Sequence, residues 1–595
     1  MKGDKVLELE GVLAPDAIGQ HIATFYQTWK SQRDGWEAEK AELRNFIFQT
    51  DTTKTSVGAN TPWKNTTSRP KVCQIRDNLH ANYMAALFPH EDWFAWRAGS
   101  AEGLVINKAR NIEAYMKNKL EQSDFRQEVE KLVYDYIDYG NAFAEVVSEA
   151  KYHNTGEDAA DTPVYIGPKL QRISPIDIVF DLTANSFKNA PTVTRSLVTL
   201  GEFRKMQVSR PDAGWIEGVF DKATSARSQA YGLGTEDKLK IEAFQVDGFG
   251  SSYQYLSSGL IEVLEFEGDL YDVHTDTLKE NRRIIVIDRA WVILDEPYKS
   301  WLGRSNKEHV GWRIRPDNLM AMGPLDNLVG MQYRIDHLEN LRADVFDQIA
   351  HPVVYQKGYV EDWKWGPGEK IFGDEESDVE VFAPDTTALN ADFQIQQLEF
   401  EMEEMAGAPR QAMGIRTPGE KTAFEVQSLD NAAGRIFQNK VSHFEDVFIE
   451  PLLNQYLEAA RRNIDVVDTV RVLDDDLGVV QFLEIKKEDI QASGRLIPMG
   501  ARHFVRQNQL VQNLFQLGNS ALYADPSVQT HISGKGIARM IEELLEVEKF
   551  GLVRDNIRIA ETQESTVLAN SAQEQAEITA GTSPELIEEN LDVPE

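Results

Sequence analysis

The sequence predicts an α+β protein that is mainly helical. The N-terminal part carries apolar and aromatic residues at helical spacing, short segments rich in Val, Ile and aromatic residues follow, and long helical patterns return after Pro316. Helical and strand segments are thus grouped along the chain, which is typical of the α+β class. With 595 residues, of which 42% are hydrophobic, the chain is long enough for a sizeable core.

The net charge of −34 bears on the partners that the chain can bind. A strongly acidic surface repels polyanions, so we do not expect tight nonspecific binding of nucleic acid, although a protein that lets DNA pass without gripping it is compatible with this charge. The single cysteine, Cys73, rules out an intramolecular disulfide and a Cys-based metal site, and its helical setting indicates a small buried hydrophobe. Since neither a signal peptide nor a run of roughly 18 apolar residues is found, we expect a soluble protein made in a reducing cytoplasm.

The first 322 residues are predicted to hold helices followed by antiparallel strands. Residues 25–48 form a charged helical segment whose aromatics suggest docking onto another surface, and a helix from Val72 leads to an aromatic cluster, Phe88–Trp96, at a core edge. Two further helices lie within residues 103–150. The predicted strands cover residues 142–150, 162–173, 175–182, 261–273 and 281–297, and Gly, Pro and Asn separate them.

A long helix is predicted over residues 323–350. Its apolar residues recur at steps of three and four, with one step of seven, and make a single stripe: Leu325, Leu328, Met331, Ile335, Leu338, Val345 and Ile349. About 28 residues at 1.5 Å per residue give a length of roughly 40 Å. A long helix with so narrow a stripe fits packing beside copies of itself, and an ordinary bundle helix accounts for it equally well.

After this helix the pattern changes at His351-Pro352. Residues 352–388 form a small irregular β module that contains Trp363 and Trp365, and a second helix runs from about residue 388 to Met405. A third helix is predicted over residues 423–462.

This third helix contains Pro451, which should kink it. Strands follow at residues 466–475 and 478–485, and helix returns over residues 500–550. The segment 541–595 has 14 acidic and 3 basic residues, so we expect its final part to be frayed or disordered.

The segment GIRTPGEKTAFEV, residues 414–426, is a near match to the phosphate-binding motif G-x-x-x-x-G-K-[ST]. An extra residue, Glu420, shifts Lys421 and places a carboxylate where phosphate would lie, and a helix instead of a strand precedes the segment. A turn at residues 417–419 and a capping box at residues 422–425 explain the same letters. We interpret the segment as a turn that starts a helix, with a nucleotide-using packaging or nucleic-acid enzyme as the alternative.

No other catalytic pattern is found. The eleven histidines are scattered and lie in no HExxH or Cys/His arrangement, and the acidic run at residues 373–380 lacks the ligand spacing of a calcium loop. A G-x-S-x-G nucleophile elbow is also missing. We therefore predict that the chain is not an enzyme and uses no cofactor and no metal.

Four strings carry a resemblance to a known family. They are YDYIDYGNAFAEV, ISPIDIVFD, GPLDNLVGMQYRIDHLENL and the stretch from Gly419 to Arg462, with a helix start at Thr422-Ala423 and a kink at Pro451-Leu452. Together with the order of elements over most of residues 70–550, they resemble the portal proteins (head-to-tail connectors) of tailed double-stranded DNA bacteriophages. The likeness is greatest to portals of short-tailed phages.

The resemblance implies a portal fold assembled as a ring, usually a dodecamer, at one five-fold capsid vertex. It implies N-terminal helices and an α/β wing at 1–322, a first stem helix at 323–350, a clip at 351–387, a second stem helix at 388–406, a tunnel loop at 407–421, a long kinked helix with wing strands at 422–499 and a helical crown at 500–595.

The resemblance also implies partners. The terminase large subunit docks on the clip and pumps double-stranded DNA through the channel, where contact with DNA is transient. Tail adaptor or head-completion proteins dock later, before the genome is ejected, and the major capsid protein and scaffold surround the ring. The protein would be made in the cytoplasm of a host bacterium and reside in the virion, without a membrane. Another capsid-associated structural protein remains a further alternative.

Two groups of residues are candidate sites under this resemblance. In the tunnel loop, Arg410, Arg416 and Lys421 would contact DNA phosphates, or would pair with Glu403, Glu404 or Glu420. In the clip, Trp363, Lys364 and Trp365 would contact terminase or adaptor, or would form the core of the module. The acidic surplus would repel DNA from the channel wall, or would lie on the outer surface.

Overall fold

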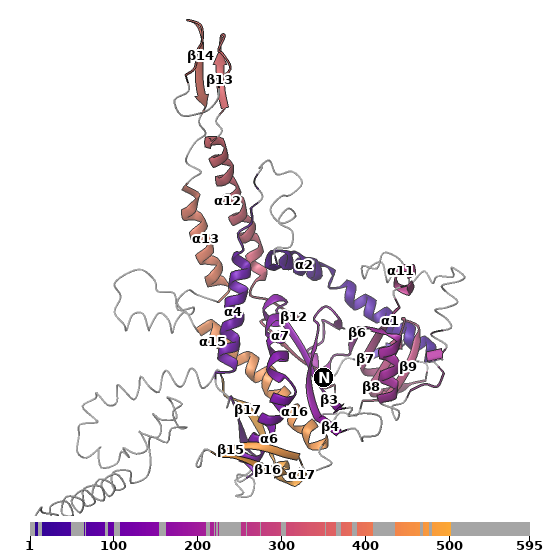
Figure 1. Cartoon of the computed structure of the whole chain (residues 1–595). Helices are drawn as coiled ribbons and strands as arrows, with labels where there is room; N and C mark the ends of the chain where they lie inside the picture. Colours follow the sequence, from indigo (N-terminus) through magenta and orange to yellow (C-terminus); the bar gives the residue numbers. More distant parts are fainter. Residues whose placement is uncertain are drawn as a thin grey trace, which may run out of the picture. The chain divides into compact units, whose positions relative to one another are not determined.

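The computed structural model confirms a mixed α+β class (Figure 1). It describes residues 6–9, 15–48, 65, 67–89, 93–99, 108–153, 162–209, 215–218, 220–221, 224, 252–257, 259–273, 275–298, 305–350, 353–363, 370–382, 390–407, 435–463, 468–474 and 479–500. By internal packing the chain divides into two units, of which the first holds residues 1–470 and 483–501. Most described residues of β15 (Asp468–Asp474) and β16 (Val479–Ile485), which form a two-stranded sheet, belong to the second.

The largest sheet of the first unit has six strands. β5 (Ile178–Phe180), β6 (Thr192–Thr199), β7 (Leu260–Asp272), β8 (Thr277–Ile287) and β9 (Trp291–Pro297) are antiparallel neighbours in this order, and β1 (Val6–Leu9) pairs with β7 in parallel. Alternate apolar residues on β7 and β8 face opposite sides. One side packs against α1 (Pro15–Ser31), and the other packs against Phe203 of α8 (Leu200–Ser209), so both faces are buried.

The aromatics of the helical segment 25–48 belong largely to the chain's own core. Tyr26 and Trp29 of α1 are buried against the six-stranded sheet, and Phe46 of α2 (Asp34–Phe48) is buried as well. For these three residues the expectation of an outward docking surface was wrong. Each helix buries one apolar face against the rest of the chain, and the removal of this apolar area from water stabilises the fold.

A second sheet contains β10 (Glu308–Gly311), β3 (Asn141–His153) and β4 (Thr162–Ile173), all antiparallel. Two helices that are far apart in the sequence, α7 (Phe125–Asp138) and α16 (Glu450–Asn463), both pack on this sheet. α7 and α6 (Ala109–Gln122) are the two helices predicted within residues 103–150.

The predicted aromatic cluster follows α4 (Lys71–Leu87). Trp93 contacts Phe88, Phe94 and Phe125 with ring centroids 4.8, 5.0 and 5.7 Å apart. Phe94 begins β2 (Phe94–Ala98), which pairs with β17 (Gly494–Pro498). The cluster therefore joins the end of α4 to α7, as the prediction of a sealed core edge requires.

Gly140 makes the turn from α7 into β3. Its φ of +71° lies in the left-handed region, and a Cβ at this position would come within 2.3 Å of the main-chain nitrogen of Gly323. The turn is thus packed against the end of β12 (Asn318–Met322), which pairs with β11 (Arg313–Arg315). Only glycine satisfies both the backbone angle and the close approach.

The helix predicted over residues 323–350 begins later than expected. α12 spans Val329–Ala350, 22 residues, after a 3₁₀ turn at Asp326–Leu328. The main-chain N–H of Gly323 donates to Oδ2 of Asp326 at 2.8 Å, so the residues before Val329 form a capped turn in place of helix.

The β module and the second helix are present. β13 (Val353–Lys357) and β14 (Asp378–Phe382) form an antiparallel hairpin, and α13 (Ala391–Met405) follows it. Figure 1 shows α12 and α13 next to each other, with the hairpin joined to the end of α12.

The third long helix is described from Arg435 onwards. α15 (Arg435–Phe444) continues into a π-helical turn, Glu445–Ile449, and then into α16, where Pro451 occupies the first turn. The departure from α-helical geometry therefore precedes the proline, because a wider turn there accommodates the missing N–H.

The described residues do not include the predicted start at residue 423, most of the loop 407–421 or any of residues 501–595. Of the helices described, none is long and apolar enough to cross a membrane.

Candidate functional site

The candidate site is the surface of α12, α13 and the β13–β14 hairpin. The chain passes from α12 through the hairpin to α13, and the two helices pack against each other. Arg342 of α12 is ion-paired with Asp392 in the first turn of α13 and lies 2.6 Å from Glu339 of its own helix. The pair of Arg342 with Asp392 connects the two helices at the end near the hairpin.

The opposite end of α13 is attached to α4. Nζ of Lys71 lies 2.5 Å from Oε1 of Glu403, and both side chains are buried. Arg69, just before α4, lies 3.2 Å from Oε1 of Glu399. Glu403 is one of the carboxylates that the sequence suggested as partners for the loop cations; the structure shows that Lys71 is a partner of it.

A short extended segment before α4, containing Asn65, Thr67, Ser68 and Arg69, runs along one face of α12. We call it the strap. Main-chain N–H groups of Asn65, Thr67 and Arg69 donate to Asp344, Asn340 and Asp336 at 3.1, 2.8 and 2.9 Å. The acceptors recur every four residues on α12, so the strap follows the helix axis antiparallel to α12.

Side chains complete this contact. Oγ of Ser68 donates to Asp336 at 2.9 Å, and the amide of Gln332 donates both to Asp336 at 2.9 Å and to the main-chain oxygen of Arg69 at 2.5 Å. Burial raises the pKa of Asp336, and the hydrogen bonds that it accepts act against that rise. The polar stripe Gln332, Asp336, Asn340 and Asp344 is thus a recognition surface for main chain.

Sequence reasoning missed the strap. It followed only the apolar stripe of this helix, whereas Asp336 and Asn340 are buried as well. The available signal was the four-residue spacing of Gln332, Asp336, Asn340 and Asp344, all of which have a side-chain oxygen that can accept from main-chain N–H. The stripe of acceptors could be found in the sequence, whereas the strap that donates to it could not.

Large apolar side chains are exposed on both helices and the hairpin. They are Tyr333, Leu341, Phe346, Ile349, Phe393, Phe400, Met405, Tyr355, Tyr359, Ile371, Phe372, Val381 and Phe382. The predicted apolar stripe of α12 is therefore buried at its beginning, at Leu328 and Ile335, and exposed at its end, at Ile349. Many exposed apolar side chains on neighbouring elements of a single chain are typical of a contact surface for another macromolecule.

The hairpin is exposed on both faces. Its strands pair from Val353 with Phe382 to Lys357 with Asp378, and Val360 bridges Gly373 beyond them. A two-stranded hairpin is marginally stable alone in water, because it can cover little apolar area. The exposed Tyr355, Tyr359 and Phe382 thus need a further surface, which the described part of the chain does not supply.

Of the six predicted site residues, the structure describes only Trp363. Its side chain is half-buried and follows the short bridge at Val360. Lys364 and Trp365 of the clip prediction and Arg410, Arg416 and Lys421 of the loop prediction lie outside the described residues. Both sets therefore stay predictions.

The helix pair is acidic. α13 carries five carboxylates, Asp392, Glu399, Glu401, Glu403 and Glu404, and no Lys or Arg.

Across the described part of the chain, no group of three or more His, Cys, Asp or Glu is arranged to hold a metal ion. Cys73 is only half-buried, in contrast to the predicted buried hydrophobe, and burial raises the pKa of its thiol.

A helix pair that ends in an exposed apolar hairpin, and that buried polar contacts attach to the rest of the first unit, is typical of a structural protein that contacts other macromolecules. Residues 19–156 match the sequence family described as bacteriophage head to tail connecting protein. This match confirms the resemblance to phage portal proteins, or head-to-tail connectors. It spans most of α1 and all of α2, α4, β2, α6, α7 and β3. A comparison with curated proteins gives no match.

Proposed function

We propose that the chain is a portal subunit that forms a ring of twelve copies, a dodecamer, at one capsid vertex. Terminase packages the genome through the channel of this ring, tail adaptor proteins dock onto it, and the genome later leaves through it. In this proposal α12 and α13 are the stem, the β13–β14 hairpin is the clip, and residues 500–595 are the crown. The closer likeness to portals of short-tailed phages is part of the same proposal.

The single observation that carries the proposal is the exposed apolar surface of the stem and hairpin. Phe393 is 75% exposed and Tyr359 is 67% exposed, and both lie on elements with little core of their own. In a ring, each subunit would cover these side chains with the next one, because a heterologous contact closes on itself when the rotation allows it. Burial of this area would supply the free energy of assembly.

Charge supports a conduit for DNA. A net charge of −34 per chain and the five carboxylates of α13 disfavour tight contact with phosphates. Arg410, Arg416 and Lys421 would then be the few cations at the constriction, and Trp363, Lys364 and Trp365 would meet terminase or adaptor. The major capsid protein and scaffold would contact the outer surface of the ring.

A structural role fits the family description better than an enzymatic one. The alternative, a nucleotide-using enzyme at residues 414–422, makes a separate prediction. Replacing Lys421 with Ala would abolish ATP hydrolysis in such an enzyme, whereas a portal subunit has no hydrolysis for the substitution to remove.

Electron microscopy of the purified full chain tests the proposal. Rings with a central hole, with a mass by light scattering of about twelve chains, are the expected result. Monomers at micromolar concentration, or closed shells, would contradict it. The Lys421→Ala variant serves as a control, because it should form the same rings.

A further inference from the structure

The edge of the six-stranded sheet has a gap. β6 pairs with β7 from Leu260 to Glu267, and β1 continues along the same edge of β7 from Asp269 to Asp272. β5 pairs with the outer side of β6, where Phe180 faces Thr192. The place beside β1, in line with β5, is filled by no described strand.

The sequence directly after β5 creates this gap. The carboxylate of Asp181 accepts hydrogen bonds from the main-chain N–H of Thr183 at 2.9 Å and from its hydroxyl at 2.7 Å. This is the geometry of an Asx turn, which diverts the chain from an extended path. β5 therefore ends at Phe180 and does not continue beside β1.

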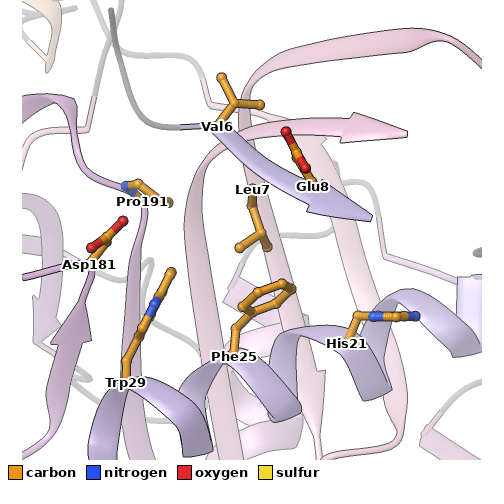
Figure 2. Close-up of a pocket in the computed structure, with 8 residues that line it drawn as sticks. All are labelled: Val6, Leu7, Glu8, His21, Phe25, Trp29, Asp181 and Pro191. Atoms are coloured by element: carbon orange, nitrogen blue, oxygen red, sulfur yellow. The ribbon is translucent and has the colours of Figure 1, made fainter. Parts of the chain in front are cut away.

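The gap is a groove with an apolar floor. Its volume is about 440 Å³, and it is lined by β1, α1, Asp181 and Pro191. Figure 2 shows Leu7 pointing toward Phe25, while Trp29 lies on the same side as Pro191 and Asp181. The rings of Phe25 and Trp29 are 5.9 Å apart, and Val6 on the rim is 37% exposed.

The charged residues around the groove indicate which kind of segment would bind there. Glu8 and Asp181 lie on opposite sides of it, His21 lies at one end, and no Lys or Arg is among the lining residues. An occupant with Lys or Arg would complement these carboxylates. With a net charge of −34, a second copy of this chain is a poor source of such a segment, which favours a different protein.

We propose that this groove binds an extended basic segment of a partner protein, which adds as a strand to the outer edge of β1. Main-chain hydrogen bonds to β1 would supply affinity, an apolar side chain would contact Phe25 and Trp29, and flanking Lys or Arg would lie near Glu8 and Asp181. The length of β1 sets the segment at about four or five residues, with a strand spacing of about 4.8 Å. The inference does not depend on the ring.

Binding of a synthetic peptide to the full chain tests this inference. The probe is a fluorescent heptapeptide of alternating lysine and valine with a central phenylalanine, measured by fluorescence anisotropy at physiological salt. Two analogues carry N-methyl groups on alternate amides, one in each register. Since a strand at an edge uses one register only, one analogue should lose binding at least about tenfold while the other retains it.

Two variants locate the site. Glu8→Lys should weaken binding about five- to tenfold, and Asp181→Asn, which retains the turn, should weaken it about two- to fivefold. Glu280→Lys, an exposed charge reversal on β8 outside the groove, is the matched control and should change binding less than twofold.

Three outcomes would overturn the inference. They are no binding of the probe, equal losses for the two methylated analogues, and equal losses for Glu8→Lys and Glu280→Lys. The last result would mean that the probe is attracted by the net charge of the chain alone. A peptide with glutamate in place of lysine that binds equally well would contradict the proposed basic occupant.

Discussion

Lys71 and Glu403 form a buried ion pair across 332 positions of the sequence, with Nζ 2.5 Å from Oε1. The pair connects the first turn of α4 to the last turn of α13. It thereby joins α4, which lies within the family match at residues 19–156, to α13, which lies outside that match.

Removal of one partner of this pair should destabilise the chain strongly. Glu403→Ala leaves the ammonium of Lys71 buried without this carboxylate, so we expect a loss of about 3–5 kcal/mol in the free energy of unfolding. The double variant Lys71→Met with Glu403→Met removes both charges and should lose far less. Urea unfolding followed by circular dichroism compares them; equal losses in the two variants would show that packing, and not charge, dominates here.

The strap predicts a graded response along α12. Asp336→Ala leaves the main-chain N–H of Arg69 without its acceptor, which should lower the free energy of unfolding by about 1–3 kcal/mol. Asp347→Ala removes only an exposed contact with Asn65 and should change it by less than about 0.5 kcal/mol. Hydrogen exchange provides the specific readout, since the amides of Thr67 and Arg69 should lose protection in the first variant alone.

Gly140 and Gly35 make a matched pair for backbone effects. Gly140→Ala must adopt a φ of +71° and places its Cβ against Gly323, so we expect a loss of more than about 1 kcal/mol in stability. Gly35 lies in α2, and apart from its chain neighbours and the backbone of its own helix no heavy atom lies within 4 Å of its Cβ position. Gly35→Ala should therefore stabilise the chain by about 0.4–1 kcal/mol. Thermal unfolding measures both, and a destabilised Gly35→Ala would contradict the argument.

We expect the burial of His309 to make the free energy of unfolding sensitive to acid. It is packed between Phe143, Phe180 and Phe187, its Nε2 lies 3.0 Å from Oδ1 of Asn141, and burial lowers its pKa to about 3. An unfolded histidine titrates near pH 6.5, so the unfolded state binds the extra proton between pH 6.5 and 3. The free energy of unfolding should therefore fall as the pH decreases through this window.

The control for this prediction is His309→Gln. Burial raises the pKa of Asp135 to about 6 and of Glu145 to about 7, and these groups act with the opposite sign because the folded state retains their protons. The difference between the parent and the variant isolates His309. It should become smaller as the pH falls from 6.5 to 4.5 in urea unfolding; a difference that does not vary with pH would refute the assignment.

The proposed ring predicts that substitution of Phe393 disturbs assembly. The exposed position of this side chain in a single chain would not predict such an effect. Phe393 is 75% exposed on α13, and Val208 is 71% exposed on α8, away from the helix pair. Under the portal proposal, Phe393→Glu should abolish or weaken rings with unchanged circular dichroism, whereas Val208→Glu should assemble as the parent does. Light scattering after size-exclusion chromatography measures this. Intact rings of Phe393→Glu would remove α13 from the interface.

Much of the secondary structure was predictable because its signals are local. The stripe from Leu328 to Ile349 predicted α12, the runs of Val and Ile predicted β7 and β8, and Gly and Pro separated the strands. The local apolar pattern failed in two places. The Gly323–Asp326 turn delays the start of α12, and the sheet buries Tyr26 and Trp29, whose surroundings no neighbour in sequence reveals.

The sequence by itself determined the α+β class, the long helices and the small hairpin between two of them, since periodicity and turn residues act within a few positions. It also set the acidic charge and the family resemblance. Only the tertiary structure decided that Glu403 meets Lys71, that Asp336 accepts from the strap, and that β1 lies beside β7 with a gap next to it. These contacts join residues far apart in the chain, so they depend on how whole elements pack and not on local preference.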